Sequence, residues 1–269
     1  MIIGLNGYIG SGKDTVGAMI QEITRTPMDG DKGYKNMEGN IVPLLKNPTH
    51  WYIKKFAEKL KQTASLLTGI PRERFEDQDF KKTYLGKEWD YPSVIFVDHL
   101  TEQEQRDFLY GLEDSSYLEN NKLMHRMTVR EFLQKLGTEA ARYGLHTNTW
   151  VNALFSDYVC IGTYSFVIVD YSKDDEPAEW IGEPYDIYPN WVITDTRFPN
   201  EAQAIKDKGG IIVRINRALP TADYETLEQK HPSETSLDNW DFDHVIENNM
   251  SKKELYHEVE IMLNKFQIT

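Results

Sequence analysis

The segment Gly7–Lys13 constrains what this chain can fold into more than any other part of the sequence. It reads Gly-Tyr-Ile-Gly-Ser-Gly-Lys and satisfies the G-x-x-x-x-G-K pattern of a phosphate-cradling loop. The apolar run Ile2–Leu5 precedes it, and Lys13–Ile23 follows it with apolar residues at helical spacing. The order strand, tight loop and helix is the context that the motif requires, and it indicates an α/β fold.

The residue types in this loop predict that it binds a nucleoside triphosphate. Glycines allow backbone conformations that other residues avoid, so successive N–H groups can point inward at a positive helix N-terminus. Lys13 would add a mobile positive charge for the β- and γ-phosphate oxygens. The alternative, a Gly-rich turn without a ligand, leaves the position between a first strand and an amphipathic helix unexplained. The predicted nucleotide-binding residues are Gly7, Gly10, Ser11, Gly12, Lys13, Asp14 and Thr15.

Asp14 departs from the general pattern of this motif. The residue after the lysine is normally a Ser or Thr whose hydroxyl binds Mg²⁺, and here Thr15 comes one position later. A carboxylate so near a triphosphate would be repelled unless it faces the metal or a cation. Two alternatives therefore stay open: Asp14 reaches Mg²⁺, directly or through water, or Thr15 takes that role.

A second acidic residue follows a later strand. The β-prone run Trp191–Thr194 is closed by Asp195, and Arg197 lies two residues beyond on the same loop. Because α/β sheets bind ligands at the carboxyl ends of their strands, we expect Asp195 to hold Mg²⁺ and Arg197 to contact phosphate. The alternative for Asp195 is a turn former or a helix cap.

Elsewhere the pattern alternates strands with helices, which predicts a parallel sheet covered on both faces. Residues 71–127 are expected to form helices and loops outside this sheet, and residues 28–48 and 173–189 to form surface insertions. Strands are predicted at 51–56, 166–169, 191–194, 211–215 and 244–247. Helices are predicted at 57–67, from a cap at Thr128 through Leu136, at 149–158, from a cap at Asn200 to 206, and from a capping box at Ser251 to the end of the chain.

Composition narrows the classes of partner. The chain has 269 residues with 30 Lys and Arg against 43 Asp and Glu, a formal charge of −13. Such a surface repels a polyphosphate backbone, so nucleic acid is not expected as a partner. No apolar window is long enough to span a membrane, which predicts a cytoplasmic protein. The single cysteine, Cys160, has no disulfide partner and is expected to be a small buried residue.

Four sequence blocks stand out together: Gly7–Thr15; Arg130–Glu139 with Arg142 and Trp150; Ile193–Glu201; and His231–Glu234. These blocks resemble the bacteriophage-type deoxynucleoside monophosphate kinases, a branch of the nucleoside monophosphate kinase fold. Their order and rough spacing agree with that family over about half of the chain.

This resemblance implies transfer of the γ-phosphate of ATP to a deoxynucleoside monophosphate, with Mg²⁺ as cofactor. It implies a three-layer α/β P-loop kinase with a parallel sheet flanked by helices, a helical acceptor-binding region near residues 57–150 and a lid within 217–240. We expect one domain with its core at residues 1–27, 51–67, 128–160, 191–216 and 244–269, insertions near 28–50 and 170–190, and residence in a host cytoplasm if the gene belongs to a phage. The implied acceptor-site residues are Arg130, Gln134, Gly137, Thr138, Arg142 and Trp150.

Four of the six acceptor-site residues also have a structural alternative. Arg130 and Arg142 could pair with Glu139 or Glu131 on the same helix, which contributes little. Gln134 could be solvated, and Trp150 could fill the core. His231 and Glu234, in the expected lid, could brace a loop. Related enzymes can carry a basic residue where this chain has Glu131, so that cation is missing here.

Lys13, Arg130, Arg142 and Arg197 are the cations predicted to converge on the transferring phosphoryl group. Two rival functions remain at the level of sequence. One is a P-loop kinase for another small phosphorylated metabolite or coenzyme precursor, and the other is a nucleotide-binding switch or motor ATPase. The oligomeric state is left open between a monomer and a homodimer.

Overall fold

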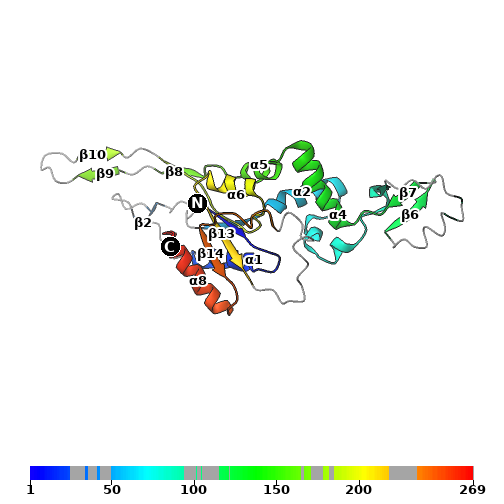
Figure 1. Cartoon of the computed structure of the whole chain (residues 1–269). Helices are drawn as coiled ribbons and strands as arrows, with labels where there is room; N and C mark the ends of the chain where they lie inside the picture. Colours follow the sequence, from blue (N-terminus) through cyan, green and yellow to red (C-terminus); the bar gives the residue numbers. More distant parts are fainter. Residues whose placement is uncertain are drawn as a thin grey trace. The chain divides into compact units, whose positions relative to one another are not determined.

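The structure is a computed structural model whose elements are labelled in Figure 1. It describes residues 1–24, 50–93, 101, 104, 115–120, 122–163, 185–217 and 235–268, together with the backbone alone of 34–35, 41–42, 164, 167–170 and 178–181. The chain forms two compact units, one of Met1–Phe56 with Val151–Thr269 and one of Ala57–Trp150. Each unit is described by itself.

A five-stranded parallel sheet forms the centre of the first unit. Its strand order is β14-β13-β1-β12-β4, so the strand that leads into the phosphate loop is the middle one. Its Ile3 lies opposite Val192 on one side and Ile211 on the other. The parallel sheet is thereby confirmed, and the chain crosses over β1 when it passes from β12 to β13. The strands are β1 (Ile2–Asn6), β4 (Trp51–Lys54), β12 (Asn190–Ile193), β13 (Ile211–Asn216) and β14 (His244–Glu247).

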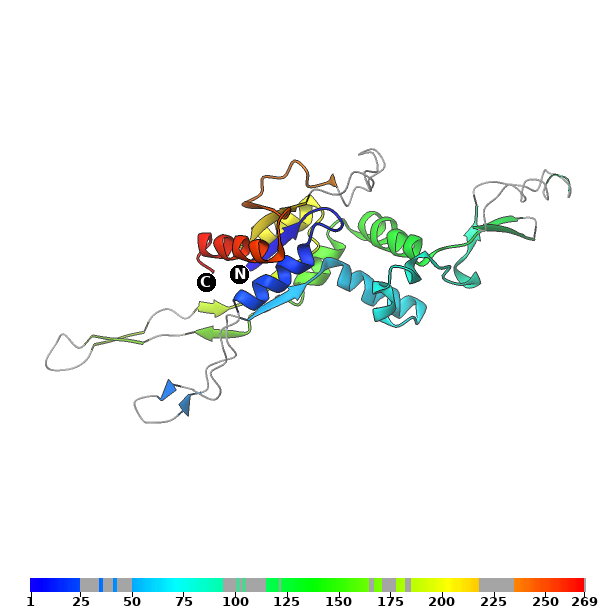
Figure 2. The ribbon, with the colours of Figure 1, turned by 90° about the horizontal axis from the view of Figure 1, so that it is seen from below.

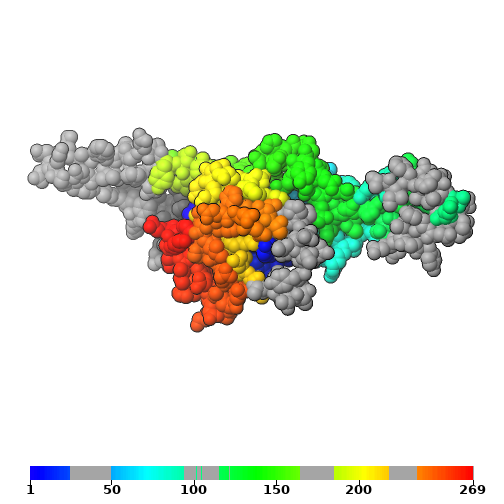
Figure 3. Space-filling view, in the orientation of Figure 1, coloured from blue at the N-terminus to red at the C-terminus, as the bar shows by residue number. Residues whose placement is uncertain are grey.

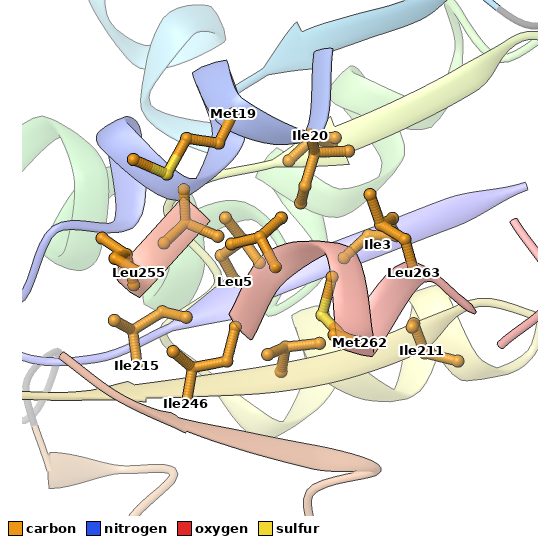
Figure 4. Packing of buried hydrophobic residues seen from close by; sticks show 14 of the residues in the cluster. Ile3, Leu5, Met19, Ile20, Ile211, Ile215, Ile246, Leu255, Met262 and Leu263 are labelled. Atoms are coloured by element: carbon orange, nitrogen blue, oxygen red, sulfur yellow. The ribbon is translucent and has the colours of Figure 1, made fainter. Parts of the chain in front are cut away.

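One face of this sheet packs against α1 (Lys13–Ile23) and α8 (Lys252–Lys265), which lie side by side in Figure 2. Side chains alternate across a strand, so Ile3 and Leu5 point to this face. Figure 4 shows them meeting residues of both helices and of the neighbouring strands. The residues labelled there are Ile3, Leu5, Met19, Ile20, Ile211, Ile215, Ile246, Leu255, Met262 and Leu263.

The opposite face of the sheet is covered by α5 (Thr149–Phe155) and α6 (Pro199–Lys206). Ile2, Trp191 and Ile193 point to this side and are at most 2% exposed. Helices on both faces of a parallel sheet make three layers, so the three-layer α/β fold predicted from the sequence is confirmed.

Two helix starts differ in how closely they follow the prediction. The capping box at Ser251 is present, because the Ser251 hydroxyl accepts from the Glu254 N–H at 3.3 Å and the Glu254 carboxylate accepts from the Ser251 N–H at 2.9 Å. The cap predicted at Asn200 is wrong. The helix begins at Pro199, whose fixed φ suits a first helical position, and Phe198 is the cap residue.

The strand predicted to end at Phe56 ends at Lys54 instead. Phe56 is the first residue of α2 (Phe56–Thr68), and its N–H donates to the Asp195 carboxylate at 2.8 Å. Because this N–H donates to a side chain, it does not extend the strand ladder, and the chain enters the helix here. The helix ends before Gly69, as predicted.

The second unit holds most of α2 and a small core around Ala64, Phe75, Val129 and Phe132. Short 3₁₀ turns follow α2, and then comes a three-stranded antiparallel sheet in the order β5-β7-β6. This sheet corrects the prediction that residues 71–127 contain only helices and loops. The elements are η1 (Arg72–Glu76), η2 (Phe80–Lys82), η3 (Lys87–Trp89), β5 (Tyr91–Pro92), β6 (Ser116–Glu119), β7 (Lys122–His125), α4 (Val129–Gln134) and η4 (Lys135–Leu145).

Short antiparallel pairs occupy parts of the expected insertions. The strand predicted at 166–169 exists as β9 (Val167–Asp170), but it pairs with β10 (Ala178–Ile181) and not with the central sheet. Two further pairs join β8 (Gly162–Tyr164) to β11 (Tyr185–Ile187), and β2 (Tyr34–Lys35) to β3 (Ile41–Val42).

Three other predictions concern single segments. Cys160 is exposed and its thiol donates to the Gly162 carbonyl at 3.0 Å, so the prediction of a buried cysteine is wrong. Most of the expected lid, including His231 and Glu234, lies outside the described residues. Among the helices that the structure describes, none has the length and apolar character needed to cross a lipid bilayer.

Candidate active site

The phosphate loop leaves the middle strand of the first unit and enters α1 directly. Ile9 in this loop is 69% exposed, and atoms of the N-terminal segment, drawn in blue, reach the surface in Figure 3. The loop is closed by hydrogen bonds from the Ser11 N–H to the Tyr8 carbonyl and from the Val16 N–H to the Gly12 carbonyl, at 3.1 and 2.9 Å.

Two glycines of the loop are required by the geometry around them. Gly7 and Gly12 have φ angles of 152° and 99°, which other residues rarely adopt. A Cβ at Gly7 would lie 2.5 Å from the Ile215 carbonyl oxygen, and a Cβ at Gly12 would lie 2.5 Å from the Asn248 amide nitrogen. Glycine is therefore needed at Gly7 and Gly12 for the loop to adopt this conformation, whether or not a ligand is bound.

Side-chain donors hold the carbonyl groups of this loop. The Lys13 ammonium donates to the carbonyls of Gly7 and Tyr8 at 2.6 and 2.7 Å, and lies 3.5 Å from the Ser11 hydroxyl. Arg217 donates to the Gly10 carbonyl at 3.2 Å, and Asn248 to the Ser11 carbonyl at 2.8 Å. Each of these four carbonyl oxygens is thus occupied by a donor, which lowers the negative partial charge that an incoming phosphate would meet.

Asp14 contacts two side chains from neighbouring strand ends. Its Oδ1 atom lies 2.9 Å from the Lys55 ammonium and accepts a hydrogen bond from the Thr194 hydroxyl at 2.7 Å. Burial alone would raise the pKa of the Asp14 carboxyl, but the hydrogen bonds from Lys55 and Thr194 and the charges of Lys55 and Lys13 lower it overall. Asp14 is therefore ionised and held by a cation that the sequence analysis did not name.

Asp195 lies at the same sheet edge and is 9% exposed. Its Oδ1 atom accepts the Phe56 N–H at the first turn of α2, where the positive end of a helix dipole stabilises a carboxylate. The helix-cap alternative for Asp195 is therefore realised, and its role toward Mg²⁺ stays a prediction. The N–H groups of Arg197 and Phe198 both donate to the buried Glu201 carboxylate, at 2.8 and 3.1 Å, which fixes the loop backbone.

A buried arginine supports the phosphate loop from β13. Arg214 is 8% exposed, and its guanidinium donates to Asn6, to Asp238 at 3.0 Å and to Asn216 at 3.2 Å. It also lies over the Tyr8 ring, 4.6 Å from the centroid, while the Tyr8 hydroxyl donates to the other oxygen of Asp238 at 2.8 Å. The last residue of β1 and the second residue of the loop are thus tied to one cation.

In the second unit, Arg130 and Glu131 lie in the first turn of α4, which begins at Val129. The Thr128 hydroxyl caps this helix by accepting the Glu131 N–H at 3.2 Å, as predicted. The Glu131 carboxylate does not complete a capping box, because it accepts from the Tyr91 hydroxyl at 2.6 Å and lies 2.8 Å from the His125 ring. Arg130 is exposed and donates to Gln78 at 3.4 Å, so it does not form the pairs with Glu131 or Glu139 that were the alternative.

The other residues predicted for the acceptor site lie on three helices: Gln134 on α4, then Gly137, Thr138 and Arg142 on η4, whose wider π-type turns continue α4, and Trp150 on α5. Gln134 is exposed, whereas Thr138 and Arg142 are partly exposed. Trp150 is 6% exposed, and its indole N–H donates to the Gly137 carbonyl at 2.8 Å. This contact corresponds to the core alternative for Trp150, so a direct contact with a base stays a prediction.

The structure therefore gathers Lys13, Asp14, Asp195 and Arg197 on one unit, and Arg130, Gln134, Gly137, Thr138, Arg142 and Trp150 on the other. Convergence of all these cations stays a prediction. Within the described ranges, His, Cys, Asp and Glu side chains form no group of three or more suited to a metal. Sequence reasoning missed Lys55, because the strand was predicted to continue to Phe56 whereas it ends at Lys54. It also missed Arg214, for which a charged residue inside the apolar run 211–215 was a usable signal.

Comparison with known proteins identifies the family of this chain. The family model described as "Deoxynucleotide monophosphate kinase" matches residues 83–259, which is more than half of the chain. The match includes α4, η4 and the Asp195 loop but begins after the phosphate loop. A relative, the deoxynucleoside-5'-monophosphate kinase of Escherichia phage T5, is 23% identical over 266 residues, covering 88% of this chain and 85% of that protein. The resemblance found from the sequence blocks is confirmed: this chain belongs to the deoxynucleotide monophosphate kinase family and is a phosphotransferase that acts on small nucleotides.

Proposed function

We propose that the chain transfers the γ-phosphate of ATP to a deoxynucleoside monophosphate, with the donor held by Gly7–Thr15. The observation that carries this proposal is the loop itself, in which four carbonyls are occupied by donors and Lys13 lies at the start of α1. A loop of this shape at a helix N-terminus suits a polyphosphate. Lys13 would exchange its loop carbonyls for the β- and γ-phosphate oxygens, which are stronger acceptors.

The acceptor is proposed to bind to α4 and η4. Arg130 and Gln134 are exposed four residues apart on one helix face, which suits a phosphate and a base edge. Thr138 is partly exposed and continues this surface, whereas Gly137 is buried and its carbonyl is held by Trp150. The net charge of −13 favours free nucleotides over nucleic acid as substrates.

Magnesium fits the residues proposed for it. Asp14, Thr15 and Asp195 offer only oxygen atoms, and Mg²⁺ in phosphoryl-transfer sites takes one or two carboxylates or hydroxyls and completes its shell with phosphates and water. When bound, the ion would neutralise charge on the transferring phosphoryl group. Lys13 and Arg197 are proposed to contribute further positive charge, while the protein excludes water that would otherwise hydrolyse ATP.

A coupled assay of ADP release tests the proposal. We expect turnover that depends on one or more of the four deoxynucleoside monophosphates and exceeds turnover with ribonucleotides or other phosphorylated metabolites. Lys13→Ala should abolish transfer while circular dichroism shows an intact fold. ATP hydrolysis that needs no acceptor would indicate a switch or motor instead, and near-normal activity of Lys13→Ala would refute the assigned donor site.

A further inference from the structure

Asp14 is a negative charge built into the first turn of the helix that we propose receives a triphosphate. Its side chain is 73% exposed, so it is not hidden from a ligand at the loop. A carboxylate at a helix N-terminus is stable by itself, but it opposes the binding of a second anion at the same place. The chain must therefore compensate this charge when a nucleotide binds.

Lys55 is placed to provide this compensation. Its ammonium lies 2.9 Å from Asp14 Oδ1, and its side chain is 34% exposed. It directly follows β4, while Thr194 directly follows β12, and the two strands are paired up to Ile193 opposite Lys54. The Thr194 N–H also donates to the Lys54 carbonyl at 3.1 Å, so the two groups that hold Asp14 are fixed to each other by the sheet.

Lys13, the lysine of the phosphate motif, contacts the loop backbone. Lys13 donates to the carbonyls of Gly7 and Tyr8 within the loop. In our proposed function its charge is directed to the phosphates. Lys55 lies within ion-pair distance of Asp14, and the charge of Lys13 also lowers the pKa of the Asp14 carboxyl.

We propose that Lys55 is a positioning residue of the donor site that acts through Asp14: it neutralises and orients this carboxylate, so that the loop can accept a nucleotide polyphosphate. The inference rests on the proposed donor site. It predicts that the loss of the Lys55 charge weakens nucleotide binding only when residue 14 is negative.

Isothermal titration calorimetry with ATP, in EDTA and again with Mg²⁺, tests this coupling without relying on turnover. Lys55→Met keeps most of the side-chain stem and removes the charge, and we expect it to weaken ATP binding in EDTA by roughly tenfold at low salt. Asp14→Asn keeps an oxygen that can accept from Thr194. In that background, Lys55→Met should change the affinity by less than about twofold. Lys55→Arg should restore binding, because it restores the charge.

Lys252→Met is the matched control, since it removes one positive charge from an exposed position at the start of α8. It should leave ATP affinity unchanged. Equal affinity of Lys55→Met and the unchanged protein would overturn the inference. So would a loss of the same size in the Asp14→Asn background, because Lys55 would then act on the nucleotide itself. Absence of ATP binding by the unchanged protein would instead refute the proposed donor site. If Lys55→Met does not fold, Lys55→Gln tests the same loss of charge.

Discussion

Replacement of Arg214 by methionine should destabilise the first unit strongly. Among the described residues, the Arg214 guanidinium is the hydrogen-bond donor to Asn6 Oδ1, and methionine cannot replace it. Asn6 is 4% exposed, and a buried oxygen left without a donor costs about 1–3 kcal/mol. Breaking a fully buried ion pair costs about 3–5 kcal/mol. The Asp238 side chain is 30% exposed, so water screens this pair and we reduce its share to about 1–2 kcal/mol.

Together these losses amount to about 2–5 kcal/mol, and we use a value of about 3 kcal/mol. For a cooperative unit of this size, 1 kcal/mol corresponds to a shift of roughly 2–4 °C in Tm, so Arg214→Met should lower the Tm by about 6–12 °C. Scanning calorimetry measures this shift. Arg74→Met is the control, because Arg74 is exposed and lies over the Phe80 ring, a contact that contributes about 0.5–1 kcal/mol.

A second substitution separates the buried charge from simple packing. Asp238→Asn removes the anion that Arg214→Met leaves behind, so the double variant should be more stable than the sum of the single losses predicts. Additive losses, or a Tm decrease for Arg214→Met no larger than that for Arg74→Met, would refute the view that this network supports the loop.

The remaining predictions concern the second unit. Trp150→Phe removes the hydrogen bond to the Gly137 carbonyl and should lower the free energy of unfolding by about 1 kcal/mol. Because Gly137 is proposed to bind the acceptor, KM for the deoxynucleoside monophosphate should rise several-fold while KM for ATP is unchanged. Unchanged values of both KM would contradict this role. Burial raises the pKa of Glu131, but hydrogen bonds from Tyr91 and His125 lower it overall, below the ordinary value of 4.5. The ionised form of Glu131 therefore adds stability above about pH 4.5, and this stability is lost as the pH falls through the folded-state pKa. The Tm difference between the unchanged protein and Glu131→Gln should narrow in acid. A Tm difference that is independent of pH would show that the charge of Glu131 does not contribute to stability.

Most strands of the sheet around the proposed donor site could be predicted from local sequence alone. Strands buried on both faces read as near-continuous apolar runs, as do Ile2–Leu5 and, interrupted by Arg214, Ile211–Ile215. The capping box at Ser251 also needs only four consecutive residues. The phosphate loop is as local, since its glycines and Lys13 lie between the first strand and the first helix.

The contacts that adjust the site could not be predicted in this way, because they join residues far apart in the chain. Thr194 and Asp14 are 180 positions apart, and Arg214 and Asn6 are 208 positions apart. Glu131 fitted a capping box in sequence, yet Tyr91, 40 positions away, takes its carboxylate. A strand of two residues such as β5 is too short to show an alternation of apolar and polar residues, so the small sheet of the second unit was missed as well.

An acidic protein that binds a polyanion needs local compensation more than a general excess of cations. Around the phosphate loop, three carboxylates of the described residues each have partners of their own: Asp14 has Lys55, Asp238 has Arg214, and Glu201 has two backbone N–H groups. Because these carboxylates are already neutralised or hydrogen-bonded, the charges of Lys13 and Arg217 act on the loop and its ligand with less opposition. The formal charge of −13 is therefore compatible with nucleotide binding. Lys55 and Arg214 contribute to this by neutralising the carboxylates that they face, Asp14 and Asp238.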